Sequence, residues 1–466
     1  MKLSSFQKRP SHTMLLLIAF ILASFSLLVV YPGVMYSDSY NRISMAQLIE
    51  TGQTGFRQYL TVLPSVFIAL FHFITNNYAT YALVQAVFFL WTILEVFYLC
   101  IKNTIFVIIA FVALSPILIG YSIYWETGPV VAAMLVWLVI IDQKTCPDNK
   151  RKMNGTSILY WVLYFVCCFV ITGYRINAAT AIVGLLVWNV FVCGRGKRFA
   201  ELFKKCAFAI LGILTAILLP IALGIQSGNN MGVGMLWETA CVINRIGPGK
   251  GYDTYLDDLI GDGNTEKIFD VENPEESMYN FSDVYDFYGI TINDHGAIRD
   301  KYLNIIKEEP IQFCKVKFKI IGNVLTQANF WEYDRNRYDE MHNYGFSDTM
   351  RRDRAIETVV QYMNRLTFLR TPVFLFVMAL ALLIVCCCLR IQVIPLIKTF
   401  FVACYYEGGY FITTQAYEFR YFFPAWLLLV LVILAAAGNI VRGLWANGHP
   451  QAEVLEYGIE KGETVL

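Results

Sequence analysis

Apolar runs long enough to cross a membrane recur along the chain and limit what it can fold into. Each run has roughly 17 to 24 residues, and about 20 residues of α-helix cross roughly 30 Å of hydrocarbon. Charged residues make up only 16% of the 466 residues, against about 25% in a typical soluble domain, and hydrophobic residues make up 57%. The mean hydropathy is +0.51. We therefore predict an all-α polytopic membrane protein.

The number of spans depends on one short run, Thr61–Ile74. Its length of about 14 residues and its Pro64 fit a re-entrant or juxtamembrane helix better than a span. One crossing more would move every later loop to the other side, whereas the basic loops at 142–156 and 194–206 belong on the cytoplasmic side. We therefore expect a cell-membrane protein with about ten transmembrane helices, a retained first helix at Met14–Val30 and both termini in the cytoplasm.

The spans divide the chain into four regions. A polar block of about 145 residues separates the first seven spans from the last three, and the same topology places it outside the membrane. Its last part, from Ala297 to Phe330, has the periodicity of helices with a break at Glu309-Pro310. We expect an N-terminal membrane domain at 1–225 with juxtamembrane helices in its outer loop at 31–77, a mostly helical extracytoplasmic domain at 226–371, C-terminal membrane helices at 372–441 and a cytoplasmic tail at 442–466.

Several familiar chemistries have no motif in this sequence. It contains no HExxH motif, no zinc-type Cys/His spacing, no P-loop and no GxSxG motif. Most of the 12 cysteines lie in or beside apolar runs without a CxxC pair, so we interpret them as small membrane hydrophobes. The net charge of +1 gives no indication of a nucleic-acid partner.

Two acids and two arginines are predicted at the outer surface. Asp38 follows the first span, Glu126 follows the third, and Arg175 and Arg420 each lie at the outer end of a span. Each has an ordinary structural explanation, since the acids suit helix starts and arginines extend to lipid headgroups. The basic loops alone indicate the topology, however, without reference to these four residues. The same topology brings all four to one surface. Two carboxylates and two guanidiniums there suit a reaction on a phosphate-bearing lipid.

The order of these motifs resembles that of the GT-C superfamily of membrane glycosyltransferases, which use polyprenyl-linked sugars. This superfamily includes protein O-mannosyltransferases and bacterial aminoarabinose and lipopolysaccharide sugar transferases. The chain departs from it at Leu63-Pro64, where many relatives have His-Pro or Lys-Pro. The matching motifs are Pro32-Gly33 followed by Asp38-Ser39, the Pro64 helix, Glu126, Arg175-Ile-Asn177, the Glu309-Pro310 helix and Arg420-Tyr421-Phe-Phe-Pro424.

The resemblance implies inverting sugar transfer from a polyprenyl-phosphate-sugar donor to a glycan, lipid or protein acceptor among the membrane lipids. Asp38 matches the first-loop catalytic aspartate and would act as the general base on the acceptor hydroxyl. No cofactor is certain: a divalent metal is possible, but the sequence lacks the DxD motif of metal-binding members. The residues expected to bind the donor are Glu126, which stands where the family commonly has Asp, together with Arg175, Asn177, Arg420 and Tyr421.

Two other functions fit parts of the pattern. A Wzy-like polysaccharide polymerase or ligase also has many spans, a large outer loop and outer arginines, but does not specifically need an acid after the first span. A lipid or solute transporter would place ionisable residues near the middle of its spans, often in inverted repeats, and no such repeat is apparent.

Overall fold

The protein is all-α over the described part of the chain. The computed structural model describes residues 10–58, 60–101, 103–144, 156–193, 199–227, 230–286, 289–290, 295–326, 343–346, 350–391, 393–412 and 419–448. These residues form 19 α-helices, two short 3-10 helices and one parallel pair of two-residue strands.

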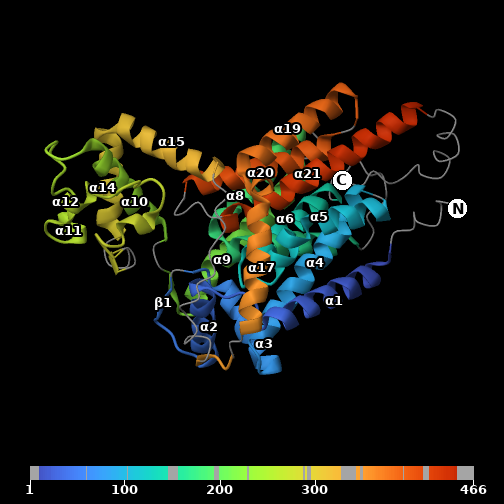
Figure 1. Cartoon of the computed structure of the whole chain (residues 1–466), viewed down its shortest axis with the longest axis horizontal. Helices are drawn as coiled ribbons and strands as arrows, with labels where there is room; N and C mark the ends of the chain where they lie inside the picture. Colours follow the sequence, from blue (N-terminus) through green and yellow to red (C-terminus); the bar gives the residue numbers. More distant parts are fainter. Residues whose placement is uncertain are drawn as a thin grey trace.

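Five helices are long and apolar enough to cross a membrane, and they run alongside several shorter apolar helices (Figure 1). The described helices thus support a membrane protein, whereas ten crossings and their direction remain a prediction. The five long helices are α1 (His12–Val30), α4 (Ala79–Ile101), α5 (Thr104–Ser122), α9 (Phe199–Ala222) and α21 (Phe419–Gly448). The other apolar helices are α3 (Leu63–Thr75), α6 (Gly128–Lys144), α7 (Thr156–Tyr174), α8 (Ala179–Cys193), α19 (Pro372–Cys388) and the more polar α20 (Ile394–Ile412).

Two helices lie between α1 and α4. The first, α2 (Ser37–Glu50), begins directly after Tyr36, which occupies the cap position and whose backbone N–H donates to Ser39 Oγ. The second, α3, has only 13 residues and carries Pro64 in its first turn, where a proline needs no hydrogen-bonded N–H. α2 and α3 pack on each other at one end of the helix bundle (Figure 1).

A separate lobe follows α9. Its helices have their own hydrophobic core around Trp237, Phe281 and Ile320, and Figure 1 shows it standing apart from the apolar helices at one end of the molecule. The chain enters it through β2 (Gln226–Ser227), which pairs in parallel with β1 (Arg57–Gln58) between α2 and α3. The helices of this lobe are α10 (Asn230–Ile246), α11 (Asp257–Ile260), α12 (Asn264–Ile268), η3 (Met278–Phe281), α14 (His295–Glu308) and α15 (Pro310–Thr326).

The lobe covers only part of the range expected for the extracytoplasmic domain, 226–371. The later helices α17 (Met350–Arg365) and α18 (Thr367–Arg370) leave it, and α17 packs on α1 and α5 instead. Met363 lies directly over Gly120 of α5, where a Cβ atom would be 2.6 Å from its sulfur. A glycine at this position therefore lets the polar helix α17 lie closely against an apolar one.

A buried polar cluster joins four helices at the end of the bundle opposite α2. Asp142 binds Lys205 Nζ at 2.7 Å and Lys398 Nζ at 2.5 Å, and Asn189 Nδ2 donates to Asp142 Oδ1 at 2.8 Å. Pairing offsets the cost of burying these charges. Residues 199–206, expected in a basic loop, instead form the first turns of α9, because Lys205 reaches Asp142 at the end of α6.

Candidate active site

The segment after α1 pairs with the connection between α5 and α6. Val34 N–H donates to the Ile123 carbonyl at 3.0 Å, Trp125 N–H donates to the Val34 carbonyl at 3.1 Å, and the Trp125 indole donates to the Pro32 carbonyl at 2.8 Å. Gly33 has a φ of +115°, and a Cβ atom there would lie 2.7 Å from the Trp125 indole nitrogen. Only glycine accommodates both this conformation and this close approach. The pairing fixes the start of α2 beside the residue that follows Trp125.

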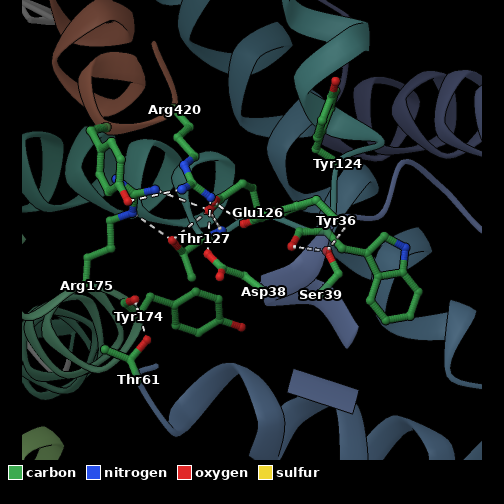
Figure 2. Close-up of polar contacts among 12 residues, drawn as sticks. Tyr36, Asp38, Ser39, Thr61, Tyr124, Glu126, Thr127, Tyr174, Arg175 and Arg420 are labelled. Atoms are coloured by element: carbon green, nitrogen blue, oxygen red, sulfur yellow. Dashed lines mark hydrogen bonds and ion pairs between the residues drawn. The ribbon is translucent and has the colours of Figure 1, made fainter. Parts of the chain in front are cut away.

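That residue, Glu126, lies at the centre of the site (Figure 2) and is 3% exposed. One carboxylate oxygen accepts hydrogen bonds from the Tyr36 hydroxyl and, at 3.4 Å, from Arg420 Nη1. The other accepts from Arg175 Nη2 at 3.2 Å, from the Thr127 N–H at 2.5 Å and from the Thr127 hydroxyl at 3.1 Å. Glu126 therefore joins residues from four separate parts of the chain.

Glu126 is held as an anion by its surroundings. Burial alone would raise its pKa, but the guanidiniums of Arg175, Arg42 and Arg420 and the hydrogen bond from Tyr36 lower the pKa well below its usual range. Burial and the neighbouring Glu126 charge raise the pKa of the Tyr36 hydroxyl well above its usual value, so it keeps the proton that it donates. A carboxylate stabilised this strongly is a poor proton acceptor.

Asp38 is the accessible acid of the site. It lies in the first turn of α2 and accepts a hydrogen bond from Arg420 Nη1 at 3.1 Å. Its side chain is 25% exposed, compared with 10% for Arg420 and 3% for Glu126. Arg420 Nη1 thus contacts both acids, one open to solvent and one enclosed.

Arg175 and Arg420 share an aromatic neighbour. Their guanidiniums lie 5.0 Å and 4.9 Å from the ring centre of Tyr421, within the range of cation–π attraction, and Arg420 Nη2 donates to the Tyr421 hydroxyl at 3.2 Å. Arg175 Nε also donates to the Thr127 hydroxyl at 2.7 Å. The two arginines are therefore oriented from several sides before any substrate binds.

Two members of the site were missed in the sequence, namely Tyr36 and Arg42. Arg42 is 5% exposed, and its Nη1 donates to the Trp125 carbonyl at 2.9 Å and to the Tyr36 hydroxyl at 3.4 Å. It follows Asp38 by four residues on α2, a spacing that places both side chains on one side of a helix. This four-residue spacing from Asp38 is the sequence pattern that could have identified Arg42 as a member of the site.

The structure brings together five of the six predicted site residues: Asp38, Glu126, Arg175, Arg420 and Tyr421. Asn177 lies two residues beyond Arg175 in η2 (Ile176–Ala178), half-buried, and within the described part of the chain its side chain takes no part in these hydrogen bonds.

The site carries more positive than negative charge. Three guanidiniums, from Arg42, Arg175 and Arg420, surround the carboxylates of Asp38 and Glu126, which leaves a net charge of one positive unit. Planar guanidiniums are suited to phosphate oxygens. Among the described residues, no group of three or more His, Cys, Asp or Glu side chains is placed to hold a metal ion. The arrangement is therefore suited to an anionic substrate next to an accessible carboxylate.

Comparison with known protein families, curated proteins and solved structures found no match for this chain. The chemistry of the site therefore has to support any functional assignment.

Proposed function

We propose that this chain is a membrane glycosyltransferase of the GT-C type, which transfers a sugar from a polyprenyl-phosphate donor to an acceptor hydroxyl with inversion. The observation that carries the proposal is the contact of one guanidinium, that of Arg420, with both the accessible Asp38 and the enclosed Glu126. Four of the residues that carry the resemblance, Asp38, Glu126, Arg175 and Arg420, thus meet in one cluster, although 382 residues separate Asp38 from Arg420 in the chain.

Asp38 acts as the general base in this proposal. The acceptor hydroxyl oxygen forms a bond to the anomeric carbon while the bond from that carbon to the phosphate oxygen breaks, and the hydroxyl proton passes to Asp38. General bases contribute typically 10²- to 10⁴-fold to the rate. Asp38 suits this role better than Glu126 because its side chain is 25% exposed and, among the described residues, is paired with a single arginine.

The arginines stabilise the leaving group. A polyprenyl phosphodiester carries one negative charge, and its departure as a phosphate monoester adds a second charge to the phosphate oxygens. Arg175 and Arg420 are preorganised around Glu126 and Tyr421, so they need little rearrangement to meet this charge.

We place the reaction at the outer membrane surface. The proposed topology has ten crossings, and the basic loops support this orientation by the positive-inside rule. The helix α2, which carries Asp38, is followed by β1, and β1 pairs with β2 at the entry of the α10–α15 lobe (Figure 1). That lobe would then stand beside the acceptor.

Replacement of Asp38 by Asn tests the proposal. Purified full-length protein would be incubated with polyprenyl-phosphate-linked hexoses and pentoses and with lipid-linked glycan acceptors, and labelled product would be counted. We expect Asp38→Asn to lower the rate by about 10²- to 10⁴-fold with unchanged thermal stability. The matched control Asp300→Asn, at an acid of the lobe whose side chain is 63% exposed, should keep the full rate. Full activity in Asp38→Asn would refute the assignment and favour the polymerase or ligase alternative.

A further inference from the structure

Glu407 is a buried acid that the proposed reaction does not use. It lies in α20, is 1% exposed and precedes the last residue of that helix, Ile412, by little more than one turn. Neither of its carboxyl oxygens has a hydrogen-bond partner among the described residues. A buried carboxyl group without partners is strongly unfavourable, and native structures seldom contain one unless something else satisfies it.

Two tyrosines on the same stretch of α20 contact the arginine site. The Tyr406 hydroxyl donates to the Tyr421 carbonyl at 3.0 Å, and the ring of Tyr410 stacks on that of Tyr421 with 5.0 Å between ring centres. Glu407 follows Tyr406 directly and precedes Tyr410 by one turn. Its neighbours in the helix, Tyr406 and Tyr410, thus contact Tyr421, the residue whose ring lies under both the Arg175 and Arg420 guanidiniums.

Close packing of α20 on α8 fixes the part of α20 that carries Glu407. Gly409 of α20 contacts the side chain of Thr180 on α8, and a Cβ atom on Gly184 of α8 would lie 2.5 Å from the Tyr405 side chain. Glycines at both points let α20 approach α8 just beyond the 3-10 helix that follows Arg175. The place of Glu407 relative to the arginines thus depends on two packed helices rather than on a loop.

We infer that Glu407 accepts hydrogen bonds from the hydroxyl groups of the sugar that is transferred. This inference rests on the proposed function. A carboxyl group repels phosphate but accepts hydrogen bonds from hydroxyls, whereas the guanidiniums of Arg175 and Arg420 attract phosphate. In this arrangement the phosphate of the donor binds at the arginines, and its sugar lies towards α20.

Binding measurements with and without the sugar test the inference. Full-length protein in lipid nanodiscs would be titrated with polyprenyl phosphate and with polyprenyl-phosphate-linked mannose, glucose and arabinose. For the sugar lipid that the unmodified protein prefers, Glu407→Gln and Glu407→Leu should weaken binding by about tenfold or more, as expected for the loss of a hydrogen bond to a charged group. Affinity for bare polyprenyl phosphate should not change, whereas Arg420→Gln should weaken both.

The control is Thr399→Val, two turns nearer the start of α20, where the hydroxyl donates to the carbonyl of Pro395 in its own helix. It should bind both lipids normally. Unchanged affinity of the Glu407 variants for the sugar lipid would overturn the inference, and so would an equal loss for both lipids. If Glu407→Leu does not fold, the size-conserving Glu407→Gln decides. An unmodified protein that binds neither lipid would contradict the proposed function itself.

Discussion

Replacement of Glu126 by Gln should destabilise the folded protein by about 3 to 5 kcal/mol, the usual range when one partner of a buried ion pair is removed. Glu126 accepts hydrogen bonds from Tyr36, Arg420, Arg175 and Thr127, the last through both its N–H and its hydroxyl. An amide has only one oxygen. If it keeps Tyr36 and Arg420, its NH₂ group faces the Arg175 and Thr127 donors. The Thr127 hydroxyl can turn to accept from this NH₂ group, whereas the hydrogen bonds from Arg175 Nη2 and the Thr127 N–H are lost. At about 1.5 to 3 kcal/mol for each hydrogen bond to a charged group, the loss of these two bonds agrees with the first range.

The assay is equilibrium unfolding in mixed detergent micelles, with the folded fraction followed by tryptophan fluorescence. The matched control is Glu201→Gln, which removes an acid paired with Lys204 at 3.0 Å on the exposed side of α9. A surface pair contributes about 0 to 1 kcal/mol, so this control should unfold nearly as the unmodified protein does. If Glu126→Gln also unfolds within about 0.5 kcal/mol of the unmodified protein, Glu126 does not hold Arg175 and Arg420 as described.

Three further predictions concern the same site. Gly33→Ala should destabilise by about 1 to 3 kcal/mol, because it forces a left-handed conformation and a Cβ atom 2.7 Å from the Trp125 indole, and should therefore lower the unfolding temperature; an unchanged temperature would contradict the close approach. Tyr36→Phe removes one hydrogen bond to Glu126 and should slow transfer by roughly tenfold, with little change in donor affinity; a change in affinity alone would place Tyr36 in binding. The Glu126 contribution to stability should stay constant from pH 5 to 8. Its folded pKa lies far below the unfolded value of about 4.3, so the contribution is complete above that value and is lost only as the pH falls through the folded pKa. The measurement is the stability difference between Glu126→Gln and the unmodified protein over this range, and a difference that falls between pH 8 and 5 would show that Glu126 is not held as an anion.

Helix content was the easiest property to predict from the sequence. A run of about 20 apolar residues has few alternatives in lipid, because every backbone group must bond within its own segment. The break at Pro310 and the short helix at Pro64 were predictable for a similar local reason, since proline is tolerated in a first helical turn.

Other features depend on which helices become neighbours, and local patterns do not carry that information. Lys205 looks like a member of a cytoplasmic basic cluster, yet it is buried because α9 packs beside the end of α6. Arg42 looks like an exposed helix residue, and only the pairing of Val34 with Tyr124 brings the Trp125 carbonyl to its guanidinium. The polar α17 gave no indication that it would pack on α1 and α5.

Two attachments connect the lobe to the two halves of the site, and the first is the pairing of β1 with β2. Gly55 N–H donates to the Gly224 carbonyl at 2.7 Å and Gln226 N–H donates to the Phe56 carbonyl at 3.0 Å, which ties the entry of the lobe to the segment after α2. On its other side, Lys317 Nζ of α15 lies 3.5 Å from the carbonyl oxygen of Ile412, where α20 ends. The first attachment leads to the helix of Asp38, and the second lies between Glu407 and Arg420 in the chain. Under the proposed function, a rotation of the lobe would change the distance between Asp38 and Arg420, so an acceptor that docks on the lobe would alter the geometry of the site without touching either residue.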